Sequence, residues 1–210
     1  MLLDRRSFVL GAAAVGLVMA VPGLALAQEA VDTNLLHAAP PLGDKVLGDP
    51  AAPVTVVEYA SMTCPHCASF HNNTLDAFKE KYVDTGKVRY IFREFPLDAA
   101  AFGIAMLARC APADQYFNVV DVYFDQQQNW GRSQQPYDAI LDIARQFGFS
   151  KESFDACLSN QAMFEGLNAE KERAANQFRV EATPTFFING KKMSGALSLE
   201  ELDKEIEPLL

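Results

Sequence analysis

The run Val54-Thr55-Val56-Val57-Glu58-Tyr59-Ala60, followed three residues later by Cys64-Pro65-His66-Cys67, sets the architecture of this chain. The first part is β-rich and nearly all apolar, which is typical of a buried central strand. The second part opens a stretch, residues 65–83, in which apolar residues recur at helical spacing. Pro65 suits the first helical turn because its missing N–H loses no hydrogen bond there. Two thiols two residues apart at a strand–helix junction indicate a redox-active dithiol.

Further strand and turn signals surround this unit. Gly86 is a typical helix stop, and the run at residues 88–95 predicts a second strand that Pro96 ends. The order strand, helix, strand predicts a βαβ unit with a parallel pair of strands. Upstream, residues 42–47 predict a short strand, which is separated from the central strand by turn residues.

The remainder of the chain divides into a helical part and a second β-rich part. Strand patterns at 185–188 and 191–193 flank Asn189-Gly190, a strong hairpin signal. Ser198 and Glu201 form a capping box for a last helix over 199–210. Between the two β-rich parts only helical patterns occur, over residues 99–111, 113–128, 136–147, 151–159 and 161–178.

This order predicts the α/β class, in the form of a thioredoxin fold with an inserted all-helical domain. The expected parts are a first thioredoxin-like segment at 42–96, the insertion at 97–178, and a second thioredoxin-like segment at 179–210. Aromatic residues of the insertion and of the helix after the dithiol favour a core role over a substrate surface, because apolar runs at helical spacing face inward. They are Phe70, Tyr116, Phe117, Tyr123, Phe124 and Trp130.

The first 27 residues have the features of a signal peptide. Arg5-Arg6 is basic, an apolar stretch follows, and Ala25-Leu26-Ala27 is a cleavage signal. Gly and Pro interrupt the apolar stretch, which favours cleavage after about Ala27 over a permanent membrane anchor. The two arginines resemble a twin-arginine signal, and an ordinary secretory signal is the alternative. Residues 28–41 are polar and Ala-rich without a period, so we expect a flexible leader.

Charge and cysteine content restrict the function further. The full chain carries a formal net charge of −9 and has no basic patch, which argues against nucleic acid or anionic lipid as a partner. The four cysteines all lie after the signal peptide, and an even number in an exported protein indicates disulfides. Cys110 and Cys157 either form a structural disulfide or remain buried free thiols. The bridge would contribute about 4 kcal/mol in the chain-entropy model.

The dithiol, the acid six residues before it, the helical insertion and Thr183-Pro184 before the hairpin together resemble the DsbA family of exported thiol:disulfide oxidoreductases. The resemblance covers about residues 45–208. It implies that the Thr183–Pro184 bond is cis and faces the dithiol, where an unfolded chain can pair with Thr183 as an added strand. A trans bond is the ordinary alternative. Thr183 itself resembles the isomerase-type relatives more than a typical DsbA.

The chemistry is expected to begin at Cys64. At a helix N-terminus, backbone N–H groups and the helix dipole favour a thiolate, so Cys64 is the predicted nucleophile and Cys67 resolves the mixed disulfide. The alternatives are a permanent local disulfide or a metal site that includes His66 and His71. His66 either donates to the Cys64 thiolate or is a solvent-facing spacer. We expect His71 to be a partly exposed helix residue.

Glu58 is the remaining candidate, because it interrupts an apolar strand close to the dithiol. It is predicted to exchange a proton with Cys67, a role that the resemblance also implies. The alternative is an ion pair with Lys79 or Lys81.

These features predict a periplasmic oxidant of protein thiols that needs no bound cofactor and no metal. Its expected substrates are reduced or unfolded exported proteins, and the resemblance implies a DsbB-like membrane partner that re-oxidises it. A disulfide isomerase or reductase is the alternative. Such relatives usually carry an N-terminal dimerisation domain, for which the leader is too short, so we expect a monomer. A redox-inactive peptide-binding chaperone is the alternative from another class.

Overall fold

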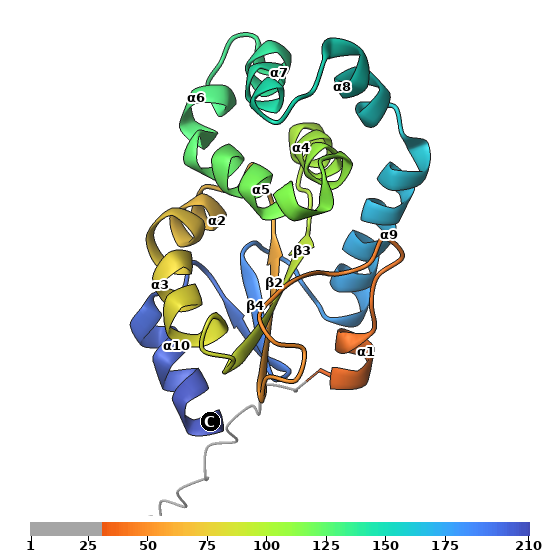
Figure 1. Cartoon of the computed structure of the whole chain (residues 1–210). Coiled ribbons are helices and arrows are strands. Elements are labelled where there is room, and N and C mark those ends of the chain that lie inside the picture. Colours follow the sequence, from red (N-terminus) through yellow and green to blue (C-terminus); the bar gives the residue numbers. More distant parts are fainter. Residues whose placement is uncertain (1–30) are drawn as a thin grey trace, which may run out of the picture.

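The computed structural model describes residues 31–210, in which helices pack on both faces of one mixed sheet (Figure 1). The expected signal peptide and the first residues of the leader lie outside the described residues. The sheet order is β1-β3-β2-β4-β5, in which β2 and β3 are parallel and the other neighbours antiparallel. The strands are β1 (Lys45–Leu47), β2 (Val54–Ala60), β3 (Val88–Glu94), β4 (Thr185–Ile188) and β5 (Lys191–Ser194). The predicted order βαβ, helical insertion, ββα is confirmed.

Strand β2 lies at the centre of the sheet, and all its residues are buried. Successive side chains of a strand point to opposite faces, so its residues divide between two cores. Val54 and Val56 belong to the larger core, which also contains the helical insertion. Val57 and Tyr59 belong to a smaller core on the other face. Glu58 alternates with Val57 and therefore lies on the face of the larger core.

The helix that follows the dithiol is continuous over residues 65–83, as predicted. It consists of α-helical segments α2 (Pro65–Phe70) and α3 (Asp76–Phe78), each followed by a π-helical turn, η1 (His71–Leu75) and η2 (Lys79–Val83). The sequence did not predict the π turns. Single π turns within a helix occur often at functional sites, and the first one here begins at His71.

The insertion lies at the top of Figure 1, beyond one end of the sheet. The predicted single helix over 113–128 is wrong, because the chain breaks at Gln126 (φ −90°, ψ 11°). Trp130 Nε1 donates to the Tyr123 carbonyl at 2.8 Å, which gives that buried carbonyl a partner at the break. The helices are α4 (Ala99–Cys110), η3 (Ala113–Gln115), α5 (Tyr116–Asp125), α6 (Gln127–Gly131), α7 (Pro136–Gln146), α8 (Lys151–Leu158) and α9 (Gln161–Gln177).

The leader is ordered over residues 31–41, which corrects the expectation of a flexible segment. This segment forms α1 (Thr33–His37), capped by Asp32, and Leu36 is fully buried against the sheet. Arg93 of β3 donates to the Leu36 carbonyl at 2.8 Å, which fixes the segment in place. The C-terminal end of α9 packs in the same core through Ala174, so this helix belongs to the sheet as well as to the insertion (Figure 1).

The C-terminal part agrees with the prediction. Asn189 and Gly190 both have positive φ, as a tight hairpin turn between β4 and β5 requires. Helix α10 (Leu199–Ile206) begins at the predicted capping box, and η4 (Glu207–Leu209) continues it. Helix α10 buries Leu202 and Ile206 in the larger core and lies beside α3 in Figure 1.

Candidate active site

Cys64 is the N-cap of α2 and lies shortly after the end of β2. Its backbone is extended (φ −80°, ψ 120°), and the residue is only 6% exposed. Pro65 occupies the first helical turn, as predicted. In its protonated form, the Cys64 thiol donates to the Thr183 carbonyl at 3.2 Å. The Thr183–Pro184 bond is cis, as expected, and the contact between Cys64 and the Thr183 carbonyl places this loop beside the dithiol.

The pKa of Cys64 is lowered from 9.0 to about 5. The largest cause is a hydrogen bond from the Cys67 thiol. Burial acts in the opposite direction, and the Thr183 side chain and the backbone N–H groups of Cys67 and His66 lower the pKa further. The buried Thr183 Oγ1 makes no hydrogen bond of its own within the described part of the chain, so this hydroxyl is available to the Cys64 sulfur. Cys64 is therefore a thiolate at neutral pH, which is the nucleophilic form.

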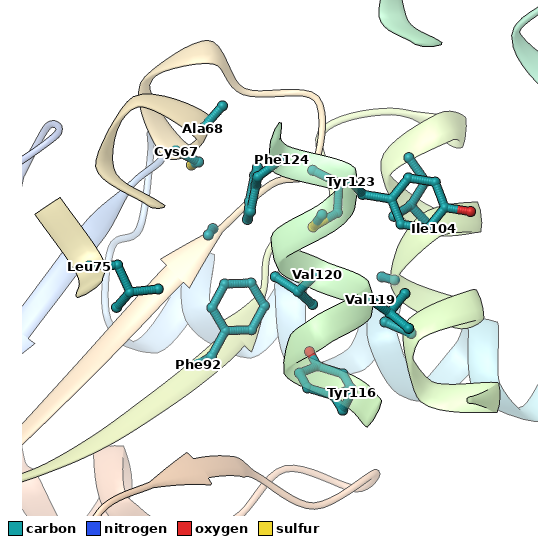
Figure 2. Packing of buried hydrophobic residues seen from close by; sticks show 14 of the residues in the cluster. Cys67, Ala68, Leu75, Phe92, Ile104, Tyr116, Val119, Val120, Tyr123 and Phe124 are labelled. Atoms are coloured by element: carbon teal, nitrogen blue, oxygen red, sulfur yellow. The ribbon is translucent and has the colours of Figure 1, made fainter. Parts of the chain in front are cut away.

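Cys67 has the opposite character. It is fully buried, and burial, the hydrogen bond to Cys64 and the charge of Glu58 all raise the pKa of its thiol. Figure 2 shows Cys67 on α2 facing the same apolar cluster as Phe124 of α5. One thiol of the pair is thus ionised and the other is held protonated, which is the division of roles that the sequence predicted.

The His66 side chain is exposed, whereas its backbone N–H stabilises Cys64. His71 lies in the next turn with its imidazole against Glu58, so the two histidines do not converge on the thiols. Among residues 31–210, no group of three or more His, Cys, Asp or Glu side chains is arranged to hold a metal ion. No helix in the same range is long and apolar enough to cross a membrane.

Glu58 is fully buried. Its Oε2 accepts a hydrogen bond from the Tyr90 hydroxyl and lies 3.3 Å from His71 Nε2. Its Oε1 is buried and has no hydrogen-bond partner among the described residues. The predicted alternative of an ion pair with a lysine is wrong, because Lys79 pairs with Asp76 and Lys81 with acids of the C-terminal segment.

His71 corrects the expectation of a partly exposed helix residue, since its side chain is only 1% exposed. The imidazole lies 4.3 Å from the Phe124 ring and 5.5 Å from the Phe92 ring, measured between centroids. Burial alone would lower its pKa, but the charges of Glu58 and Asp121 outweigh burial and raise the pKa to about 9. His71 is therefore an imidazolium at neutral pH.

Gln127 is a residue that sequence reasoning missed. From α6 it donates to the Met62 carbonyl at 2.8 Å and to the Cys64 carbonyl at 3.0 Å, and it is buried. These bonds tie the loop before the dithiol to the insertion. Gln127 also borders a cleft of about 460 Å³ beside Pro65, together with Trp130. No local pattern distinguishes such a glutamine from any other polar helix residue.

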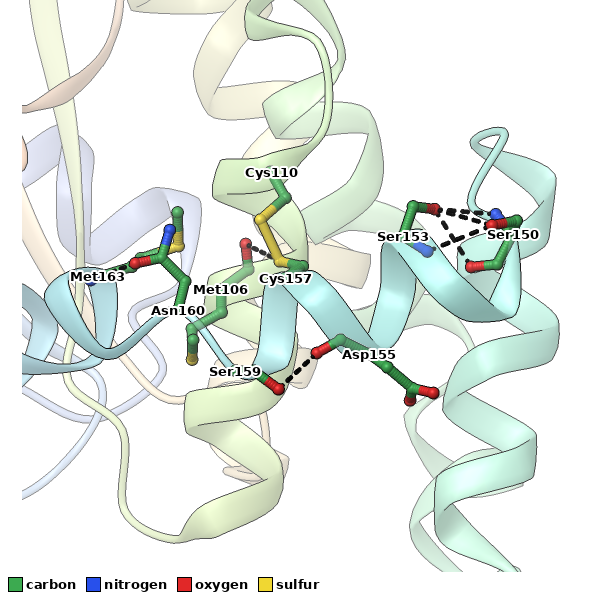
Figure 3. Close-up of a disulfide and its surroundings, with 9 residues drawn as sticks. All are labelled: Met106, Cys110, Ser150, Ser153, Asp155, Cys157, Ser159, Asn160 and Met163. Atoms are coloured by element: carbon green, nitrogen blue, oxygen red, sulfur yellow. Dashed lines mark hydrogen bonds between the residues drawn. A yellow bond between two sulfur atoms is a disulfide. The ribbon is translucent and has the colours of Figure 1, made fainter.

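The second cysteine pair is bridged in the structure (Figure 3). Cys110 ends α4 and Cys157 lies in α8, with Cα atoms 6.2 Å apart and 47 residues between them in sequence. Of the two alternatives that the sequence left open, the structure contains the disulfide. It staples two helices of the insertion.

The predicted aromatic core is confirmed, because most of the six rings are buried and none is exposed. Figure 2 shows Tyr116, Tyr123 and Phe124 along α5, with Phe92 of β3 beside them. These rings join the insertion to the sheet, and Phe117 packs against them while partly buried.

Comparison with known proteins gives a consistent result. Residues 42–208 match the family model described as thioredoxin. A Rickettsia typhi protein named as a protein-disulfide oxidoreductase is 33% identical over 80% of this chain. The match spans 62% of that relative, so the chain corresponds to somewhat less than two thirds of its length.

Two solved structures are also similar. Wolbachia pipientis alpha-DsbA1 is 34% identical, with a TM-score of 0.76 over 83% of this chain and 94% of that one. A structure described as a protein-disulfide isomerase from Novosphingobium aromaticivorans is 28% identical, with a TM-score of 0.68 over 79% of this chain and 96% of that one.

Proposed function

The chain belongs to the thioredoxin family, and we propose that it is an exported, DsbA-like oxidoreductase that introduces disulfides into substrate proteins. The observation that carries the proposal is the contrast between Cys64, with a pKa of about 5, and the buried Cys67, whose pKa is raised. A thiolate that is already stabilised is a good leaving group, so a bond to Cys64 is easily broken.

The reaction starts from the Cys64–Cys67 disulfide. A substrate thiolate attacks Cys64 Sγ, a mixed disulfide forms, and Cys67 leaves with the electron pair and takes up a proton. A second substrate thiolate attacks the substrate sulfur of the mixed disulfide. The substrate leaves with a new disulfide, and Cys64 leaves as a thiolate. Two substrate thiols are oxidised and the dithiol is reduced, so the electrons balance without a bound cofactor.

The direction of electron flow follows from the same contrast. Stabilising the Cys64 thiolate stabilises the reduced protein, and a protein that is stable when reduced is a strong oxidant. His66 is proposed to add to this effect when it is protonated, beside the backbone N–H that already faces the sulfur.

The site and compartment suggest the partners. We place the mature protein in the periplasm as a monomer, where reduced or unfolded exported proteins are its substrates and a DsbB-like membrane protein re-oxidises it. The cis Thr183–Pro184 segment beside Cys64 is the proposed docking edge for a substrate strand. Nucleic acid is not a proposed partner, because the chain is acidic.

A disulfide isomerase is the second candidate function. Two observations favour it: Thr183 precedes the cis proline, and one similar solved structure is described as a protein-disulfide isomerase. A redox-inactive peptide-binding chaperone is the weaker candidate, because the dithiol has the geometry and the ionisation of a reactive pair.

The test compares oxidation with isomerisation. The oxidised protein is mixed, in stoichiometric amounts, with a reduced unfolded protein that contains several cysteines, and thiol loss is followed in time. A parallel reaction starts from a scrambled disulfide substrate and the reduced protein. An oxidase removes substrate thiols rapidly and repairs the scrambled substrate slowly. Fast repair with slow oxidation would favour the isomerase. The chaperone would be favoured if neither reaction occurred and the Cys64→Ser variant suppressed aggregation of an unfolded protein as well as the native protein does.

A further inference from the structure

A buried histidine lies between two acids behind the dithiol. His71 Nε2 is 3.3 Å from Glu58 Oε2, and His71 Nδ1 is 3.7 Å from Asp121 Oδ1. The side chain of Glu58 is fully buried, whereas that of Asp121 on α5 is 44% exposed. One imidazole therefore spans the distance from a buried acid of the sheet to an acid of the insertion that contacts solvent.

The immediate surroundings of the His71 imidazole are aromatic. Aromatic rings pack around the imidazole, contributed by Phe70, Phe92 and Phe124. The titratable groups that face it or its acid partner come from four elements: Glu58 of β2, Tyr90 of β3, Asp121 of α5 and Cys67 of α2.

The proposed reaction requires a proton to reach the buried Cys67. Each time the disulfide opens, Cys67 leaves as a thiolate and must gain a proton. Cys67 and Glu58 are both fully buried, so neither contacts bulk water. Glu58 Oε1 has no partner among the described residues, and the charge of Glu58 acts on Cys67, so this carboxyl group is the candidate to exchange a proton with Cys67. A route from Glu58 to solvent then needs a further carrier.

We propose that His71 and Asp121 form a proton relay that connects Glu58, and through it Cys67, to solvent. The inference rests on the proposed dithiol chemistry. When the disulfide opens, Glu58 accepts a proton from His71 and passes it to Cys67, and His71 regains one from solvent beside Asp121. When the disulfide closes, the same proton leaves by the reverse route. One proton enters for each disulfide that opens, and no other group changes its charge.

The protonation of His71 at neutral pH supports this role. Its pKa of about 9 means that the imidazolium already holds the proton that Glu58 requires. Above pH 9 the imidazole is neutral and the donor is lost. The relay therefore predicts that the advantage of the native protein over a variant without His71 disappears as the pH rises through about 9.

The experiment uses a matched pair of surface variants, Asp121→Asn and Asp125→Asn. Both remove one negative charge from α5, but only Asp121 contacts His71 in the structure. Stopped-flow fluorescence of Trp130, the single tryptophan, follows exchange of the full-length protein with glutathione in both directions. We expect Asp121→Asn to slow opening and closing of the disulfide by about tenfold, less than a direct general acid would contribute. Asp125→Asn should change both rates less than twofold.

The readout separates a relay from a purely electrostatic or structural role. A relay residue changes the forward and reverse rates by the same factor and leaves the equilibrium constant with glutathione unchanged. The proposal is overturned if the rates of Asp121→Asn match those of Asp125→Asn, or if the equilibrium constant shifts as much as the rate does.

His71→Gln serves as the second variant, with its fold checked by thermal melting. Its exchange rate should fall at pH 7 and should equal that of the native protein above about pH 9. Equal rates at every pH would also overturn the relay. Any redox-active dithiol exchanges with glutathione, whether or not the protein is an oxidase. The relay can therefore fail while the proposed function stands, and the proposed function can fail while the relay stands.

Discussion

The two cysteine pairs of this protein differ both in burial and in chemistry, and the reactive pair is the more deeply buried one. Cys110 and Cys157 join two helices of the insertion as a disulfide, in which Cys157 lies in the apolar core and Cys110 is exposed. Cys64 and Cys67 are free thiols at the start of α2, with backbone N–H groups, Thr183 and Glu58 around them. Burial therefore does not by itself make a cysteine inert, because the most buried pair is the reactive one. The polar groups that reach the sulfur decide whether it is reactive.

The largest expected effect is a loss of thiol oxidation when Cys64 is replaced, with no such loss when the Cys110–Cys157 pair is replaced. Cys64→Ser removes the nucleophile and should abolish thiol oxidation, by more than about a thousandfold, because Cys67, the remaining thiol, is fully buried and protonated. Loss of thiols from a reduced peptide measures this directly. The control is the double variant Cys110→Ala/Cys157→Ala, which should retain the native rate. Comparable loss of activity in both variants would break the comparison.

The same double variant tests the structural role of the second pair. Closing a loop of this length stabilises the folded chain by about 4 kcal/mol in the chain-entropy model. Urea unfolding of the Cys110→Ala/Cys157→Ala variant should therefore show a loss of that order. A free energy of unfolding equal to that of the native chain would mean that the bridge does not stabilise the insertion.

The next effect concerns the ionisation of Cys64. Thiolate absorbance at 240 nm should titrate at a pKa of about 5 in the reduced protein. Thr183→Val removes a hydroxyl that lowers this pKa and should raise the pKa by up to about one unit, or 1.4 kcal/mol. Thr85→Val is the control, because that hydroxyl bonds to the Lys81 carbonyl. Identical titrations of the two variants would show that the Thr183 hydroxyl does not lower the pKa of Cys64.

This lowered pKa also sets the pH dependence of stability. The folded pKa of Cys64 lies below its unfolded value of 9.0, so the stabilising contribution is complete above pH 9 and is lost as the pH falls through about 5. The reduced protein should therefore gain stability relative to the oxidised protein between pH 5 and pH 9. Parallel thermal melts of the two forms measure the difference, and a constant difference across that range would contradict the pKa.

The smallest expected effect is at Gln127. Gln127→Ala leaves the Met62 and Cys64 carbonyls without their donor, which should cost about 1 kcal/mol or more of stability. Loss of the same bonds should loosen the loop before the dithiol and lower the oxidation rate a few-fold. Gln128→Ala, an exposed neighbour on the same helix, should change neither quantity. If both variants behave alike, Gln127 does not position the dithiol loop.

Much of the fold could be predicted because its signals are local. Strand β2, the helix start at Pro65, the Asn189-Gly190 hairpin and the capping box at Ser198 each depend on a few consecutive residues. The dithiol and the cis proline followed from a short motif and its family resemblance.

The errors have a common physical cause, which is contact between distant parts of the chain. The leader is ordered because Arg93, 57 residues further on, binds the Leu36 carbonyl. His71 is buried because a π turn and the aromatic rings of α5 and β3 enclose it. Gln127 reaches the Cys64 carbonyl across 63 residues. No local pattern carries this information.

The reduction potential of the Cys64–Cys67 pair shows whether the protein oxidises or reduces its substrates. The protein is equilibrated in glutathione buffers of increasing ratio, and Trp130 fluorescence reports the fraction reduced, with Cys64→Ser as the blank. Because the Cys64 thiolate is stabilised, we expect an oxidising reduction potential of about −120 mV. A value near about −270 mV, typical of a reductant, would contradict the account.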